Sequence, residues 1–234
     1  MFREFIIFTI IIFIHELGHF IMAQYYGWDI DKIYIYPFGG YVKFNTDINK
    51  PIKEELYILS MGLILQYLFY LVILFFYSIN LIEITTLMII KKYHYSIMIF
   101  NLLPIFPLDG ARLLNLIMSI KLPFKLSHKI MIYLSYIILV IVFSVSIKYF
   151  IQTNLFLILV LLLTKVIEEN KNHDSIFNKF LLERYLKDYN FTKLKIIKNN
   201  IYKMVRDKKH LFLINNNYVS EKEILRERFR NKLD

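Results

Sequence analysis

The chain has 234 residues, of which 57% are hydrophobic, and its formal net charge is +10. A soluble domain of this length rarely carries so large an apolar fraction, so the composition excludes an ordinary soluble enzyme and favours a membrane protein. Cysteine is absent, which excludes disulfide bonds and thiolate zinc ligands.

Long runs with almost no formal charge predict about five transmembrane segments. They are residues 5–25, 56–79 and 93–120, followed by two short spans within 130–164 that turn near residues 148–154. As one helix, the stretch 130–164 would be about 50 Å long, too long for a single crossing. Pro104, Pro107 and Gly110 break the third span, so a discontinuous segment is expected there.

The placement of lysine and arginine predicts the orientation in the membrane. Residues 165–234 carry 17 Lys/Arg against 10 Asp/Glu. A basic tail can bind nucleic acid, but beside a membrane it marks the cytoplasmic side, so no nucleic-acid partner is expected. With five spans the N-terminus then lies outside, and the loops at 26–53 and 119–129 lie inside.

The sequence His15-Glu16-Leu17-Gly18-His19 is the strongest chemical signal. Residues four apart share a helix face, so the two imidazoles can hold one metal ion and Glu16 can reach a metal-bound water. A carboxylate inside a span costs roughly 2.5–3.5 kcal/mol, which makes a functional role the default interpretation. The alternative is a structural pair of histidines that hydrogen-bond a neighbouring helix.

Asp109 is the only other carboxylate deep in an apolar segment, and it follows the broken part of the third span. The break frees the chain to bring Asp109 to the histidines, so it is the expected third ligand of a zinc site with one open position. The alternative is a helix cap for residues 110–120, because aspartate is a favoured N-cap. Both roles can hold in part.

The two motifs together resemble those of the site-2 protease family of intramembrane zinc metalloproteases. The second motif reads Asn101-Leu-Leu-Pro-Ile-Phe-Pro-Leu-Asp109-Gly110. Stretches at 37–42, 51–55 and 180–185 resemble, more narrowly, the members that process a pro-sigma factor in sporulation. The family has a further span before the first motif, and it often has Gly-Pro in the second span where this chain has Gly62-Leu63.

The resemblance implies a zinc metalloendopeptidase in which His15, His19 and Asp109 bind one zinc ion and Glu16 is catalytic. It also implies substrate-binding roles for Asn101, Pro104, Gly39, Gly40 and Gln66. Residues 34–44 read as two β runs around a Gly-Gly turn, and in the family such a hairpin takes substrate as an added strand. An ordinary surface hairpin is the alternative.

Residues 165–234 are predicted to form a small α+β cytoplasmic region. Residues 210–214 read as a strand, 215–217 as a turn, and Ser220 with Glu223 as a capping box that opens a helix. This pattern resembles a truncated cystathionine-β-synthase-type module, which binds nucleotide in this family. A small docking domain is the alternative. His94 and His128 stand beside lysines and are expected in solvated loops.

The sequence therefore predicts an α-helical polytopic membrane protein, with a metalloprotease domain at 1–164 and a basic tail at 165–234. The resemblance implies a membrane-associated substrate such as a pro-sigma factor, membrane inhibitor subunits as partners, and a place in the cell membrane, in particular the mother-cell-derived membrane around the forespore. Alternatives are a general site-2 protease that releases membrane-tethered regulators, and a zinc transporter or sensor. A transporter usually has polar residues along a path and repeated halves, and this chain shows one polar cluster and no repeat.

Overall fold

The computed structural model describes residues 2–28, 30–36, 39–44, 47–148, 153–198 and 200–230. Backbone contacts divide the chain into two compact units. The first comprises Met1–Thr46, Lys53–Leu103 and Leu108–Leu113, and the second comprises Asp47–Ile52, Pro104–Pro107 and Leu114–Asp234.

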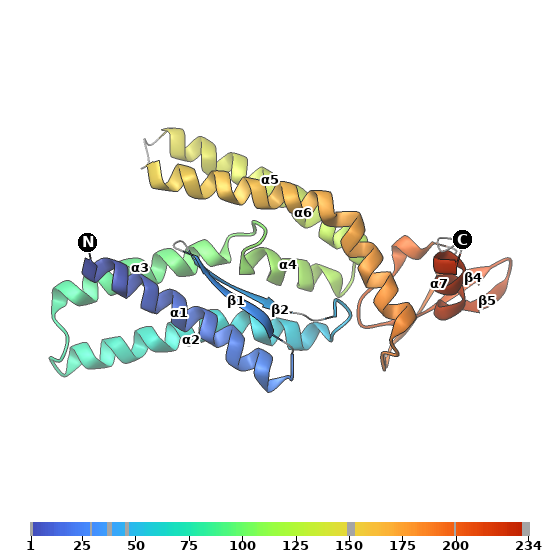
Figure 1. Cartoon of the computed structure of the whole chain (residues 1–234), viewed down its shortest axis with the longest axis horizontal. Helices are drawn as coiled ribbons and strands as arrows, with labels where there is room; N and C mark the ends of the chain where they lie inside the picture. The colour runs from blue at the N-terminus through green and yellow to red at the C-terminus, as the bar shows by residue number, and fades with distance from the viewer. Residues whose placement is uncertain are drawn as a thin grey trace. The chain divides into compact units, whose positions relative to one another are not determined.

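Three helices build the first unit: α1 (Phe2–Tyr25), α2 (Ile52–Ser78) and α3 (Ile84–Leu102). Each is apolar over most of its length, and all three contribute to one core, formed by Ile11, Ile12, Tyr70, Ile73, Leu87, Ile90 and Ile97. Figure 1 shows α1 between the other two along part of its length. Helix α1 also contacts strand β2 (Gly39–Phe44), so the hairpin lies against the helix that carries the first motif.

The hairpin consists of β1 (Ile30–Tyr36) and β2 (Gly39–Phe44), paired antiparallel. Gly39 pairs with Tyr36 and Gly40 with Ile35, so both glycines belong to the second strand. The prediction of a turn at the two glycines was therefore wrong, and residues 37–38 between the strands lie outside the described residues. Glycine is a common turn residue, but it also occurs in strands where another backbone approaches closely. The glycine pair alone therefore did not locate the turn.

The predicted discontinuous segment is present as two helices. Helix α3 ends at Leu102 and α4 (Asp109–Ser119) follows the proline-containing stretch. A Cβ atom on Gly110 would overlap the carbonyl oxygen of Leu102, so only glycine allows α4 to start this close to the end of α3. Helix α3 also begins nine residues before the predicted start of the span at residue 93.

Three helices are long and apolar enough to cross a membrane within the described part of the chain: Phe2–Tyr25, Ile52–Ser78 and Phe124–Ile147. Within the apolar stretch of each helix, only 28%, 28% and 22% is buried inside the protein. Most of this apolar surface therefore faces outward, as it does in lipid. The predicted class, an α-helical membrane protein with a short hairpin and an α+β C-terminal region, is confirmed. The number of spans and their orientation stay predictions.

The second unit contains an antiparallel pair of long helices, α5 (Phe124–Lys148) and α6 (Thr153–Leu186), which lie side by side (Figure 1). Of the turn predicted near residues 148–154, residues 149–152 lie outside the described residues. His128 lies on α5 and is 4% exposed, where it contacts Glu169 and His173 of α6. The prediction that His128 is solvated was therefore wrong.

The C-terminal region forms a three-stranded sheet covered by a helix. Strand β4 (Lys209–Ile214) pairs parallel with β3 (Leu194–Lys198) and antiparallel with β5 (Asn217–Ser220). A 3₁₀ turn, η1 (Ile201–Lys203), precedes β4, and helix α7 (Glu221–Arg230) follows β5. The predicted capping box is confirmed, since Ser220 and Glu223 exchange hydrogen bonds of 3.1 and 3.3 Å between backbone N–H groups and side chains.

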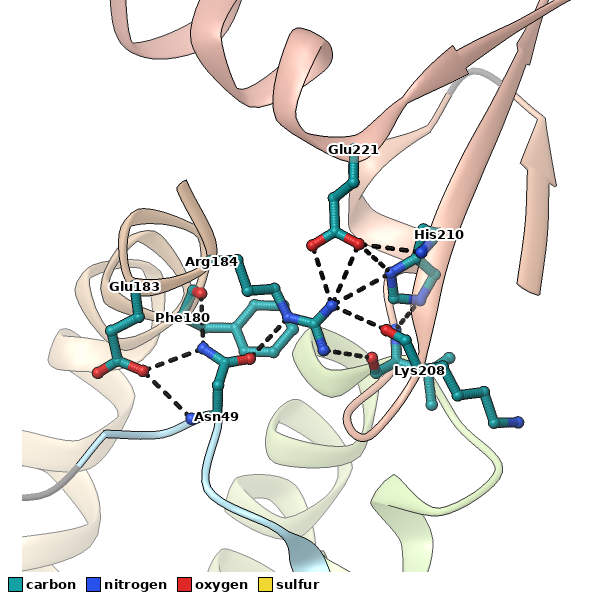
Figure 2. Close-up of polar contacts among 8 residues, drawn as sticks. Asn49, Phe180, Glu183, Arg184, Lys208, His210 and Glu221 are labelled. Carbon is teal, nitrogen blue, oxygen red and sulfur yellow. Dashed lines mark hydrogen bonds and ion pairs between the residues drawn. The ribbon is translucent and has the colours of Figure 1, made fainter. Parts of the chain in front are cut away.

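A buried polar network joins this sheet to α6 and to the loop before α2 (Figure 2). The Arg184 guanidinium donates to Asn49 Oδ1 at 2.6 Å and to Glu221 Oε1 at 3.0 Å. Asn49 in turn donates through Nδ2 to Glu183 at 3.0 Å. Arg184 is 3% exposed, so its charge is tolerated only because these acceptors surround it.

Candidate metal centre

Three side chains from two distant motifs converge in the first unit. His15 Nε2 and His19 Nε2 lie 3.0 and 3.1 Å from the same oxygen, Asp109 Oδ2, and 3.2 Å from each other. The histidines are 1% and 5% exposed. The HELGH spacing places both imidazoles on one face of α1, and the helix break places Asp109 at the first residue of α4.

The position of Asp109 bears on its two predicted roles, metal ligand and helix cap. Helix α4 is opened by the Leu108 carbonyl, which accepts from the N–H groups of Ala111 and Arg112 at 3.1 and 3.2 Å. The Asp109 carboxylate is directed instead at the two imidazoles. The structure therefore brings Asp109 to the histidines, as the ligand hypothesis requires and a pure capping role does not.

The backbone of α2 fixes the orientation of His19. Its Nδ1 lies 2.8 Å from the Ile58 carbonyl oxygen, which can only accept, so the imidazole proton is on Nδ1. In the neutral imidazole, the lone pair on Nε2 then faces the Asp109 carboxylate. Two electron-rich atoms at this distance repel each other unless a cation lies between them.

The three donor atoms fit a zinc ion. Zinc is bound by histidine nitrogen and carboxylate oxygen at about 2.0–2.2 Å, and tetrahedral angles then separate ligand atoms by about 3.3 Å. The observed triangle, with edges of 3.0–3.2 Å, comes close to that spacing. Of the residues that the structure describes, these three are the group of histidine and acidic side chains placed to hold a metal.

Glu16 lies on the same helix between the two histidines. It is partly exposed and interacts electrostatically with His15, His19, Asp109 and Arg112. The Glu16 carboxylate therefore interacts with the charges of His15, His19 and Asp109 but is not one of these three candidate donors.

The other predicted site residues fall into two groups. Asn101 lies in the last turn of α3, with Nδ2 3.3 Å from His15 Nε2, and Gln66 Oε1 lies 3.0 Å from His15 Nδ1. Gly39 and Gly40 open strand β2 in the hairpin beside α1. Pro104 lies in the second unit, where its carbonyl accepts from Ser135 Oγ at 3.4 Å.

Two residues beside the site make contacts that the sequence did not predict. Gly62 of α2 lies directly against the His19 ring. His94 lies on α3, is 1% exposed and contacts Gln66, so the prediction that it is solvated was wrong. The adjacent Lys91 and Lys92 favoured a loop, but this segment is helical, and His94 is buried although both lysines are exposed.

Fold and site describe a membrane protein with a buried group of two histidines and one carboxylate that could hold a metal ion. Comparisons with known proteins agree. Residues 4–96 match peptidase family M50. The solved structure of the site-2 protease from Methanocaldococcus jannaschii is similar, with a TM-score of 0.59 and 28% identity, covering 71% of this chain and 77% of that one.

Two curated proteins are also similar. Stage IV sporulation protein FB of Bacillus subtilis is 32% identical over 181 residues, which are 75% of this chain and 62% of that protein. A zinc metalloprotease of Methanocaldococcus jannaschii is 33% identical over 129 residues, 54% of this chain and 37% of that protein. The chain thus spans less than two thirds of the length of either relative. Together these matches show that the chain is similar to members of peptidase family M50 and to a site-2 protease.

Proposed function

We propose that the chain is an intramembrane zinc metalloendopeptidase. The observation that carries this proposal is the convergence of His15, His19 and Asp109 on one point, with Glu16 on the same helix. A zinc ion held by these side chains would supply Lewis-acid chemistry and lower the pKa of a coordinated water toward about 7. The similarity to peptidase family M50 supports the proposal.

In this proposal Glu16 is the general base and then the general acid. It removes the proton from the attacking water and later delivers it to the leaving amine, which contributes roughly 10²–10⁴ in rate. Asn101, beside His15, is suited to donate through Nδ2 to the scissile carbonyl or to hold the substrate strand. The hairpin β1–β2 lies against α1, and its edge offers main-chain groups to an extended substrate.

We further propose that the substrate is a membrane-associated protein, in particular the pro-sequence of a sporulation sigma factor. The similarity to stage IV sporulation protein FB supports this narrower assignment. A general site-2 protease acting on membrane-tethered regulators is the second candidate within the same chemistry. Co-expression with a candidate pro-sigma factor, read as a size shift on a gel, separates the two.

The catalytic proposal is tested by two substitutions that differ in one respect. Glu16→Gln keeps the shape of the side chain and all three ligands, so zinc content should stay near stoichiometric while cleavage falls below detection. Asp109→Asn weakens a ligand, so zinc and cleavage should both be lost.

Glu4→Gln, also on α1, is the matched control and should change neither quantity. Near-normal turnover by Glu16→Gln would contradict the protease assignment and favour a metal-binding protein that is not an enzyme. Full zinc and activity in Asp109→Asn would place the third ligand elsewhere.

A further inference from the structure

Gln66 is a fully buried polar side chain on α2, enclosed between α1 and α3. Its Oε1 lies 3.0 Å from His15 Nδ1, and its Nε2 lies 2.9 Å from the carbonyl oxygen of His94. The His94 ring stacks on Tyr70 of α2, with ring centroids 4.4 Å apart and planes 10° apart. Both ends of the amide are therefore occupied inside the protein.

The contact with α3 fixes which way the Gln66 amide points. A backbone carbonyl can only accept a hydrogen bond, so the amide NH₂ must face His94. The amide oxygen then faces His15 and can only accept, which requires the proton of His15 to sit on Nδ1. In the neutral ring, the lone pair on Nε2 is consequently directed at Asp109, 3.0 Å away.

The two histidines differ in what holds them. His19 Nδ1 donates to the backbone carbonyl of Ile58, an acceptor that no side-chain substitution removes. His15 depends on a side chain, Gln66. This asymmetry makes one ligand of the metal centre sensitive to a residue that touches neither the metal position nor Asp109.

We propose that Gln66 is a positioning residue that sets the tautomer and ring orientation of His15 before the metal binds. This inference rests on the proposed zinc site and goes beyond it, because it assigns Gln66 to the ligand rather than to substrate, the role that the family resemblance implied. Outer partners of metal-bound histidines typically change metal affinity by roughly 10–100-fold when replaced.

The test measures zinc dissociation constants by chelator competition on the full chain in detergent. Gln66→Met keeps the length of the side chain but removes the acceptor, so zinc affinity should fall by roughly 10–100-fold. Gln66→Glu keeps an acceptor for His15 Nδ1–H but loses the donor to the His94 carbonyl, so its zinc affinity should fall less than that of Gln66→Met. Ile73→Met, a buried position two turns further along α2, is the control for packing changes and should leave zinc affinity unchanged.

Thermal unfolding of the metal-free proteins separates positioning from a structural role. A structural role predicts that Gln66→Met lowers the unfolding temperature of metal-free protein while its zinc affinity stays at the wild-type level, and this result would overturn the inference. Equal losses of affinity in Gln66→Met and Gln66→Glu would also overturn it, because the acceptor would then not be the deciding feature. If wild-type protein binds no zinc, the proposed function and this inference fail together.

Discussion

Replacing Gly62 by alanine tests how tightly α1 and α2 hold the metal centre. A Cβ atom at this position would lie 3.0 Å or less from three atoms of the His19 ring, among them the candidate ligand atom Nε2. Non-bonded carbon atoms prefer about 3.5–4.0 Å, so the ring must move by about 1 Å or the helices must separate.

The ring has little room to retreat. Its Nδ1 is bound to the Ile58 carbonyl at 2.8 Å, one turn earlier on the same helix that carries Gly62. Metal–ligand distances are met to within about 0.2 Å, so a displacement of about 1 Å removes His19 from the coordination shell. Overpacking itself costs about 1–3 kcal/mol. Gly62→Ala should therefore lose most bound zinc and with it any cleavage, beyond a moderate loss of stability.

Gly27→Ala is the matched control for the loss of stability. Gly27 has a φ of +65° and its Cβ would meet nothing within 4 Å. Alanine there costs about 1–2 kcal/mol through backbone strain alone, so the protein is destabilised to a similar degree without any contact with a ligand. Zinc content after purification, thermal unfolding and cleavage of a reporter substrate are measured for both variants. Full zinc and normal cleavage in Gly62→Ala would refute the argument that the spacing of these helices is fixed.

Two further predictions concern the tail and the topology. Burial lowers the pKa of His210 below its ordinary 6.5. Burial would raise the pKa of Glu221, but hydrogen bonding to His210 and the charge of Arg184 outweigh it and hold that pKa below 4.5. As pH falls, both side chains take up a proton at a higher pH in the unfolded chain than in the folded one. The stability of the tail should therefore fall as pH drops below about 6.5 and again below about 4.5. Amide hydrogen exchange in β4 measures this, and Glu221→Gln should remove the lower step; a flat profile between pH 7 and 4 would contradict the linkage. For topology, a reporter after Arg230 should report the cytoplasm and one inserted at Asn80, in the turn before α3, the opposite side; both on one side would overturn the five-span arrangement.

Much of the architecture was determined by local sequence. Runs of apolar residues specify membrane helices because every backbone polar group in lipid must be bonded within the helix. The four-residue spacing of His15 and His19 places both rings on one face, which follows from helix geometry alone. The capping box at Ser220 was likewise readable, since it involves residues three apart.

Other features depended on residues far apart in the chain, and only the tertiary structure decided them. Asn49 meets Arg184 across 135 residues, and nothing in the loop around Asn49 indicates a buried partner. Gly62 resembles any small residue in a span until the His19 ring is seen against it. The burial of His94 depends on which face of α3 turns toward α2, and its neighbouring lysines misled the sequence interpretation.

The physical reason is that the periodicity of a helix predicts which residues share a face. It does not predict which other helix that face will pack against. Asp109 shows both sides of this. Its proline-rich context predicted a break in the helix and a buried carboxylate, both local properties. That its oxygen lies 3.0 and 3.1 Å from two imidazoles 94 and 90 residues earlier was decided by how α1, α3 and the start of α4 pack together.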